Sequence, residues 1–301
     1  MSTTPSCLIC GAGGCSIDFA KSGHEHWTCG ACGHLFVHPM PSSEQLAAHY
    51  NNLSDGFNST CSWDVVPRHQ LRLWRTLLSG AKSTSGMGPL LDVGCGSGHF
   101  LQCAAECGWR DLYGIDLSED AVSRASESVD AELRCVAFAT AELPTGFFSV
   151  VSMFDVIEHL ADPMGALRQA HRSLRPGGVL MVAVPHGRGL SMRAFGKNTH
   201  TVCPPEHVSH FSIDSLRLAV SESGFAIREV TTRDLFIKEW VPGGKKNDVG
   251  DASEGGDSRR IYTQWYDRLT STAALRLIPL VNVGLNRLRL GDYLVLVAVR
   301  R

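Results

Sequence analysis

A run of glycines directly after an apolar strand most constrains how this chain can fold. Residues 90–100 read Leu-Leu-Asp-Val-Gly-Cys-Gly-Ser-Gly-His-Phe. The apolar residues predict a short buried β-strand over 90–93, and the three alternating glycines let the backbone turn tightly and approach a ligand closely. A helix is then expected from about His99, with its first N–H groups facing that ligand. The pattern predicts a nucleotide-shaped ligand between a strand and a helix.

Further segments follow in an order that narrows the kind of nucleotide site. An apolar strand at 112–115 ends in Asp116, whose carboxylate can accept hydrogen bonds from both hydroxyls of a ribose. Another strand, 150–154, precedes the segment DVIEHLADP at 155–163. A predicted helix leads from there to LRPGG at 174–178 and a further strand. Strands alternating with helices indicate a largely parallel sheet.

In this order, the segments resemble those of the class I S-adenosylmethionine (SAM)-dependent methyltransferases over residues 88–186. The glycine motif is Gly-x-Gly-x-Gly, with Asp92 inside it, whereas dinucleotide enzymes such as Rossmann-type dehydrogenases have Gly-x-Gly-x-x-Gly. The resemblance implies an α/β, Rossmann-like fold. It predicts a seven-stranded methyltransferase sheet with helices on both faces, whose last strand is antiparallel, and SAM as cofactor.

The resemblance also implies which residues contact SAM. Asp92 and the backbone of 94–98 would lie by the methionine moiety, Asp116 would bind the ribose, and Leu117 would flank the adenine. The segment 139–144 resembles the adenine-contact loop, with Thr140 where many relatives have Asp. The residues expected to bind the cofactor are Asp92, Gly94, Cys95, Gly96, Gly98, Asp116, Leu117, Thr140, Ala141, Glu142 and Phe154.

Two Cys-x-x-Cys-Gly knuckles near the N-terminus predict a zinc ribbon. Each knuckle can place two thiolates on one side of a tight turn, so the two pairs together form a tetrahedral four-sulfur site. Because the protein fills every position, the Zn²⁺ is expected to be structural and to stabilise a module of roughly forty residues. The predicted ligands are Cys7, Cys10, Cys29 and Cys32, with Cys15, His24 and His26 as less favoured substitutes.

Methyl transfer to an alcohol or a carbon acid needs a base, and the segment after residue 154 offers one candidate. Glu158 and His159 are expected to face the methyl group. The segment is similar to the Glu-x-x-Glu-His of ubiquinone O-methyltransferases and small-RNA 2′-O-methyltransferases. That similarity would make Asp155, Glu158 and His159 ligands of a divalent metal. The alternative is that Glu158 and His159 line the pocket or pair with each other.

A second candidate is Glu206-His207, in the loop where acceptors usually bind. A similar pair abstracts a proton in sugar C-methyltransferases, which also carry an N-terminal zinc ribbon. This chain has Pro204 where those enzymes have tyrosine, and we do not expect it to carry their additional C-terminal domain, so a keto-sugar substrate does not follow. We expect His207 to be the general base, with His210 structural; the alternative is that His207 packs the loop against the ribbon.

Composition is that of an ordinary enzyme and excludes some function classes. A net charge of −2 gives no overall basic surface, which argues against nucleic acid as the main partner. No signal peptide or run of about 18 apolar residues is present, so we expect no membrane span and a cytoplasmic location. The 11 cysteines then read as reduced thiols and metal ligands, not as a disulfide framework.

Three units are expected along the chain: a zinc ribbon at 1–41, a helical extension and linker at 42–89, and the methyltransferase domain at 90–301. The extension holds a predicted helix at 66–78 and a Ser/Gly-rich linker at 80–89. Within the last unit, acceptor-side loops and helices occupy 186–290. They comprise a helix from Ser212 to Ser223, a polar stretch at 243–258 that is either disordered or a lid, and a helical stretch at 261–290 interrupted at Pro279.

These observations predict a SAM-dependent methyltransferase that acts on a hydroxyl or carbon of a small-molecule acceptor, a saccharide or secondary metabolite. One alternative is an RNA methyltransferase whose ribbon recognises the substrate. Another is a non-catalytic SAM-fold protein whose ribbon recruits a partner. Lys21 is the one basic residue between the knuckles, so the ribbon has no basic patch that would follow a phosphate backbone. We therefore expect the ribbon to cover or shape the acceptor site.

Overall fold

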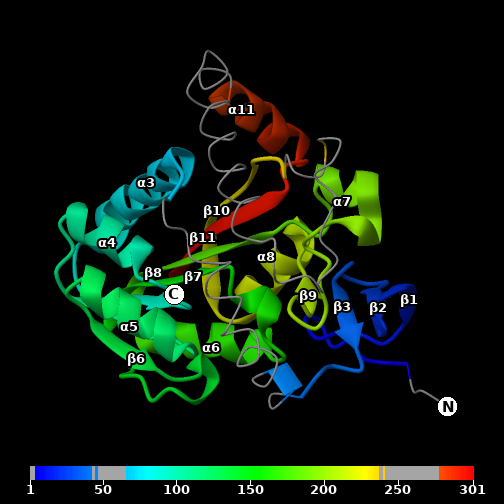
Figure 1. Ribbon diagram of the computed structural model, residues 1–301, viewed down its shortest axis with the longest axis horizontal. Helices are drawn as coiled ribbons and strands as arrows, with labels where there is room; N and C mark the ends of the chain where they lie inside the picture. The colour runs from blue at the N-terminus through cyan, green and yellow to red at the C-terminus, as the bar shows by residue number, and fades with distance from the viewer. Residues whose placement is uncertain (1–3, 43–44, 47–65, 237–239, 241–277) are drawn as a thin grey trace.

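Two β-sheets organise the computed structural model, which describes residues 4–42, 45–46, 66–236, 240 and 278–301 (Figure 1). The larger sheet has seven strands in the order β10-β11-β8-β7-β4-β5-β6. Strands β4 to β8 pair in parallel, and β11 is antiparallel to both of its neighbours. This is the predicted methyltransferase sheet, which is therefore confirmed. The strands are β4 (Leu90–Val93), β5 (Leu112–Asp116), β6 (Glu132–Cys135), β7 (Phe148–Phe154), β8 (Leu174–Pro185), β10 (Phe225–Arg233) and β11 (Tyr293–Arg300).

Helices cover both faces of this sheet because successive strand residues point to opposite sides. Leu90 and Val150 share a buried cluster with residues of α3 and α4, whereas Leu91 and Val151 cluster with residues of α6 and α8. Both faces are thus apolar, as parallel sheets require. The helices are α3 (Arg68–Ser85), α4 (His99–Glu106), α5 (Glu119–Ser128), α6 (Pro163–Ser173), α7 (Leu190–Phe195), α8 (Ile213–Glu222) and α11 (Ile278–Leu288), with 3₁₀ turns η1 (Phe138–Thr140), η2 (Ile157–His159) and η3 (Gly196–Asn198).

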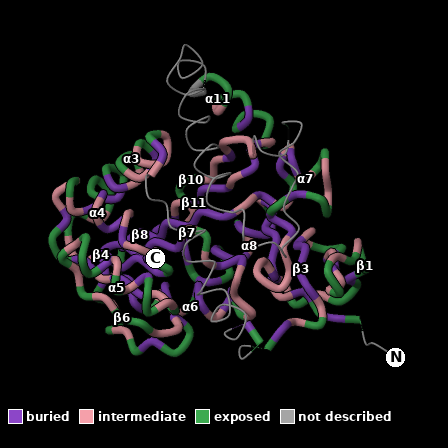
Figure 2. The backbone as a smooth tube through the Cα atoms, in the orientation of Figure 1, coloured by how far each residue is buried: buried purple, intermediate pink, exposed green. Residues whose placement is uncertain are grey.

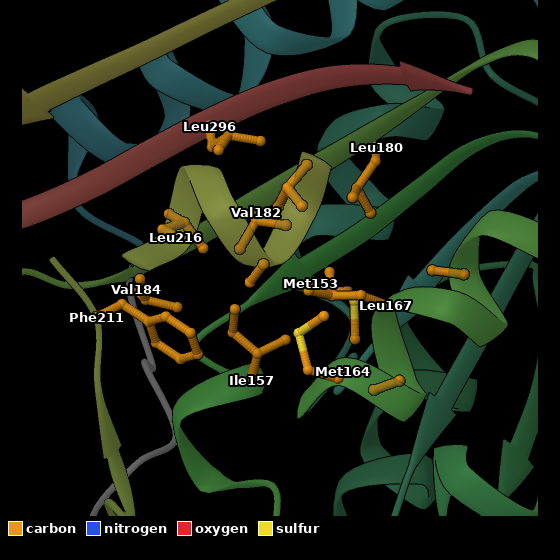
Figure 3. Close-up of a cluster of buried hydrophobic side chains, with 14 of the residues drawn as sticks. Met153, Ile157, Met164, Leu167, Leu180, Val182, Val184, Phe211, Leu216 and Leu296 are labelled. Atoms are coloured by element: carbon orange, nitrogen blue, oxygen red, sulfur yellow. The ribbon is translucent and has the colours of Figure 1, made fainter. Parts of the chain in front are cut away.

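The larger core lies between the sheet and the pair α6 and α8 (Figure 3). Leu167 of α6 faces the strands, where Met153 of β7 and Leu180 of β8 are fully buried with it. Burying a side chain of this size stabilises the fold by about 1.5–3 kcal/mol. Strands β4, β7, β8 and β11 are buried along most of their length, while the edge strand β6 and the outer faces of α5 and α11 are exposed (Figure 2).

The linker expected at 80–89 is wrong over most of its length, because α3 continues to Ser85. Its hydroxyl side chains bond backward within the helix: Ser83 Oγ donates to Ser79 O at 3.1 Å and Thr84 Oγ1 to Gly80 O at 2.9 Å. In the same helix, Ala81 is buried in the cluster that includes strand residues of the sheet. The Ser/Gly-rich composition therefore marks an exposed helix face, and the linker shortens to residues 86–89.

The smaller sheet joins the N-terminal ribbon to the rest of the chain. The ribbon supplies β1 (Cys15–Lys21), β2 (His24–Cys29) and β3 (Leu35–His38), and the fourth strand is β9 (Ser209–His210), in the order β1-β2-β3-β9. All three pairings are antiparallel. The ribbon thus shares one sheet with the loop that follows β8.

Two predicted segments lie outside the described residues, namely 243–258 and 261–277. The helical stretch expected there ends in α11, which begins at Ile278 and so has Pro279 in its first turn, where proline is tolerated. Among the helices that the structure describes, none is long and apolar enough to span a bilayer.

Replacing Leu167 by alanine should test the core that supports the site. The change removes a fully buried side chain, so the free energy of unfolding should fall by about 2–5 kcal/mol in urea denaturation. Arg168→Ala is the control, because Arg168 is half exposed and its ion pair with Asp162 spans 3.9 Å at the surface. A loss for Leu167→Ala no larger than for Arg168→Ala would contradict the packing.

Candidate active site

The glycine turn after β4 has a backbone that other residues do not readily adopt. Gly94, Gly96 and Gly98 all have positive φ, at 70°, 52° and 82°. A Cβ on Gly94 would lie 2.6 Å from Val156 Cγ2, and one on Gly98 would lie 3.1 Å from the Cβ of Ala125. The three glycines therefore form a bare-backbone cradle at the carboxyl end of the parallel strands, where ligands bind in such sheets.

The carboxylate of Asp116 stands at the end of β5 beside this cradle. Its Oδ2 accepts from Gly96 N at 2.8 Å, and its Oδ1 accepts from Ser118 N at 2.9 Å. The next residue, Leu117, exposes 53% of its surface although it is apolar. A carboxylate next to exposed apolar surface fits a ribose and a base, so the residues present fit the nucleoside of SAM.

Asp92 lies inside the strand below the cradle and is almost fully buried. Ser152 Oγ donates to Asp92 Oδ1 at 2.7 Å. Burial raises the pKa of Asp92 to about 7, and the nearby Asp116 adds to the rise. A positively charged ligand group beside the cradle would relieve this cost, which fits the charged methionine end of SAM.

Other residues expected at the cofactor site point elsewhere. Cys95 has its side chain buried against β5, and the ring of Phe154 packs against those of Trp74 and Phe100, with the Phe100 centroid at 4.9 Å. Residues 140–142 line a cavity of about 510 Å³ together with Gln169 of α6. This cavity lies on the α6 side of the loop, and Thr140 Oγ1 donates to Ala137 O at 3.2 Å.

The two histidine segments meet in one cluster although 48 residues separate His159 from His207 in the chain. Their rings pack edge to face with centroids 4.6 Å apart. Glu158 lies beside them, with Oε1 at 4.0 Å from His159 Nε2. One donor atom from each of the three residues lies within 4.8 Å of the others. The fold thus merges the two candidates into one Glu158–His159–His207 cluster.

Backbone contacts set the tautomers of both imidazoles. His159 Nδ1 lies 2.9 Å from Glu206 O, and His207 Nδ1 lies 2.8 Å from Thr201 O. Since a carbonyl can only accept, each Nδ1 carries the proton, and each Nε2 keeps its lone pair. Glu206 contributes its carbonyl here, while burial raises the pKa of its carboxyl group.

Burial dominates the electrostatics of the cluster. It lowers the pKa of His159 to about 4, and that of His207 well below 6.5 with help from His159 and His210. It also raises the pKa of Glu158 well above 4.5, to which Asp155 contributes. Both carboxyl oxygens of Glu158 are buried without a hydrogen-bond partner. Two neutral imidazoles and an unsatisfied carboxyl group form a centre suited to accept a proton or a cation.

Asp155 is not part of this cluster, because its side chain is held by another strand. The hydroxyl of Tyr293, the first residue of β11, donates to Asp155 Oδ1. The set of donors expected for a divalent metal is therefore changed: His207, not Asp155, joins Glu158 and His159 in the metal-compatible group.

The four predicted zinc ligands lie together in the ribbon. Cys7 Sγ and Cys32 Sγ are 3.5 Å apart, and Cys10 Sγ and Cys29 Sγ are 3.6 Å apart. A tetrahedron with Zn–S bonds of about 2.3 Å has sulfur–sulfur edges of roughly 3.8 Å. Ile9 N also donates to Cys7 Sγ at 3.4 Å. The geometry fits a four-sulfur zinc site.

The ribbon holds the loop that carries His207. Leu35 and Phe36 of β3 pair with His210 and Ser209 of β9. Val37 N donates to Val208 O at 2.9 Å, and Val208 N donates to Glu158 O at 3.0 Å. Lys21 Nζ donates to Val202 O at the other end of the loop.

These contacts place the ribbon, the loop at 199–211 and Glu158 in one continuous hydrogen-bonded unit. The side chains agree with this arrangement. Val37 and Val208 share a small buried cluster, and the ring of His26 lies 5.6 Å from that of His210. A segment near the N-terminus thus packs directly beside the candidate catalytic residues.

Comparison with known proteins agrees with the cradle and the sheet order. A family model for a methyltransferase domain matches residues 67–230. The chain belongs to this methyltransferase family. The resemblance to SAM-dependent methyltransferases predicted from the glycine motif is confirmed by named relatives.

Among similar curated proteins, a ubiquinone biosynthesis O-methyltransferase of Parvibaculum lavamentivorans is 26% identical over 158 residues, which cover 47% of this chain and 60% of that protein. A probable S-adenosylmethionine-dependent methyltransferase of Mycobacterium tuberculosis is 31% identical over 137 residues, covering 45% of this chain and 48% of that protein. The chain thus spans about half to three fifths of the length of these relatives.

Two solved structures show how widely the fold is shared. The [4+2]-cyclase SpnF superposes with a TM-score of 0.56 at 21% identity, covering 87% of this chain and 98% of that one. The YcgJ protein of Bacillus subtilis superposes with a TM-score of 0.51 at 15% identity, covering 78% and 99%. Identities this low show the fold alone.

Sequence reasoning missed Tyr293 and Thr201, which orient Asp155 and His207. Neither carries a local motif: Tyr293 reads as the start of an apolar strand, and Thr201 acts through its backbone carbonyl. Only the antiparallel pairing of β11 with β8, which sets Tyr293 opposite Pro185, brings that ring to the end of β7.

Replacing Gly94 by alanine should disable the cradle. Positive φ costs an alanine about 1–2 kcal/mol, and its Cβ would also displace Val156. We expect the affinity for S-adenosylhomocysteine, measured by calorimetry, to fall by about tenfold or more. Gly80→Ala in α3 is the control, because nothing lies within 4 Å of its added Cβ and binding should be unchanged. Unaltered affinity of Gly94→Ala would contradict this placement of the cofactor.

Proposed function

We propose that the chain transfers a methyl group from SAM to a hydroxyl or an acidic carbon of a small-molecule acceptor, a saccharide or secondary metabolite. The observation that carries this proposal is the Glu158–His159–His207 cluster at the same sheet edge as the cradle. The residues at the cradle fit a nucleoside with a positively charged methionine end. Net charge near zero and the names of the curated relatives support a small molecule over RNA.

His207 is the proposed general base. Its Nδ1–H is held by Thr201 O, so Nε2 offers its lone pair to the acceptor. Burial lowers the pKa of His207, so at neutral pH the imidazole is neutral and its Nε2 is not already protonated. In the transfer, the acceptor's O–H or C–H proton passes to Nε2 as the new bond to the methyl carbon forms. SAM, when bound, would supply the methyl group, and the bonding pair of its S–C bond would remain on the departing neutral thioether.

A second candidate gives the same cluster a divalent cation. The observation that favours it is Glu158, whose buried carboxyl oxygens are both unpartnered. Both imidazoles donate from Nδ1 to a backbone carbonyl, an orientation that metal-binding histidines commonly have. Glu158, His159 and His207 would hold the ion, which would make a bound hydroxyl more acidic. His207 would then be a ligand and not the base.

We further propose that the four ribbon cysteines bind a structural Zn²⁺. Sulfur–sulfur distances of 3.5 and 3.6 Å in two knuckles support this assignment. The ribbon's role would be to hold the loop at 199–211 against Glu158, and so to shape the acceptor site.

The base assignment is tested with His207→Asn. The asparagine amide can still donate to Thr201 O, but the lone pair of Nε2 is lost. Acceptors are first found by screening small-molecule extracts for label from methyl-labelled SAM. Turnover of the identified acceptor should then fall by about 100-fold or more, with unchanged affinity for S-adenosylhomocysteine. His24→Gln in the β1–β2 hairpin is the control.

Turnover of His207→Asn within a few fold of wild type would reject the base. A chelator separates the two candidates: loss of activity in EDTA, restored by Mg²⁺ or Mn²⁺, supports the cation, and full activity in EDTA supports the base. A screen in which no small molecule takes up label, while RNA does, would reject the small-molecule acceptor.

A further inference from the structure

Asp155 has an unusual conformation at the centre of the site. It directly follows β7 and has φ of 55°, a region that asparagine and aspartate enter more readily than other non-glycine residues. Its side chain is exposed, and its backbone is fixed because Asp155 N donates to Ala183 O at 2.9 Å. The residue is thus rigidly placed and open to a ligand.

Tyr293 orients this carboxylate from a strand on the far side of β8. Tyr293 lies opposite Pro185, at the end of β8, and its hydroxyl donates to Asp155 Oδ1. The hydrogen bond favours the ionised form of Asp155, whereas crowding by protein atoms raises its pKa to about 6. At neutral pH Asp155 is therefore a carboxylate whose Oδ1 accepts the hydrogen bond from Tyr293.

The groups that face Asp155 and Tyr293 are mainly acidic. The charges of Glu158 and Asp234, like that of Asp155, raise the pKa of Tyr293 further after burial. Asp234 also forms an ion pair with Arg233, at 2.8 Å. Asp92 lies under the neighbouring strand end. Such an excess of carboxyl groups is costly by itself and favours a ligand with a positive charge.

The position of Asp155 relative to the cradle indicates which charged group of the cofactor would lie near its carboxylate. Val156, the next residue, packs so tightly on Gly94 that a Cβ there would come within 2.6 Å of it. Asp155 therefore borders the turn that approaches the cofactor. SAM carries a positive sulfonium, and its product S-adenosylhomocysteine has a neutral thioether at the same atom.

We propose that Asp155, oriented by Tyr293, is the residue by which the site distinguishes the charged methyl donor from its neutral product. The carboxylate attracts the sulfonium of SAM and loses that attraction once the methyl group has left, which favours exchange of spent cofactor for fresh. Tyr293 is a positioning residue that keeps the carboxylate in place. The proposal concerns cofactor binding alone and needs no assumption about the acceptor.

The test compares the dissociation constants of SAM and S-adenosylhomocysteine by calorimetry. Asp155→Asn removes the charge but keeps the shape, and asparagine tolerates the same positive φ. Tyr293→Phe removes the orienting hydroxyl. Asp130→Asn is the control, because Asp130 is exposed and precedes β6 at the opposite end of the parallel strands. The two ligands differ in methyl and charge only, so a general structural defect weakens both alike.

We expect Asp155→Asn to raise the dissociation constant of SAM about tenfold and that of S-adenosylhomocysteine less than about threefold, so that the preference for SAM falls. Tyr293→Phe should change the preference in the same direction by a smaller factor, and Asp130→Asn should leave it at the wild-type value. Equal weakening of both ligands by Asp155→Asn, or an unchanged preference, would overturn the proposal. A wild-type preference in Tyr293→Phe would overturn the role of Tyr293.

Discussion

The backbone contact between the ribbon and the loop at 199–211 is the interaction on which the site depends. Val208 receives a hydrogen bond from Val37 and donates one to Glu158 O, so the peptide beside His207 is held on both sides. Such bonds are each worth about 0.5–1.5 kcal/mol, and the buried valines add to them. Without the ribbon, the loop would lose its strand partner β3 and its apolar cover. The proposed acceptor side is therefore assembled from chain segments more than 160 residues apart.

Burial of ionisable groups is the second constraint. Histidines 159 and 207 are kept neutral, and the carboxyl groups of Asp92 and Glu158 have raised pKa values for the same reason. The cost is concentrated at the carboxyl edge of the sheet, where a cation-bearing ligand can offset it. Structure and proposed chemistry are consistent on this point, since the family's methyl donor carries such a charge.

The sequence predicted the cofactor half of the fold well because its information is local. Gly94, Gly96 and Gly98 have the positive φ values that their spacing implies, and Asp116 lies at a strand end beside them. It predicted the four cysteines as one group for the same reason. The linker expected at 80–89 failed because serine and threonine hydroxyls can satisfy helix carbonyls, which composition does not reveal.

The proposed acceptor half could not be predicted to the same depth, since it depends on contacts distant in sequence. His159 and His207 each stood out alone, but nothing local indicated that they share one cluster, or that Tyr293 removes Asp155 from it. The pairing of β3 with β9 was equally hidden, because a two-residue strand has no periodicity to detect.

Hydrogen–deuterium exchange tests the coupling between ribbon and site most directly. The comparison is between wild type and a Cys29→Ser, Cys32→Ser variant that cannot complete the four-sulfur site. We expect the peptide covering 199–211 to lose protection in the variant, while the peptide covering the cradle and α4 at 90–106 keeps it. Unchanged protection of 199–211 in a variant with an unfolded ribbon would show that the ribbon does not hold this loop.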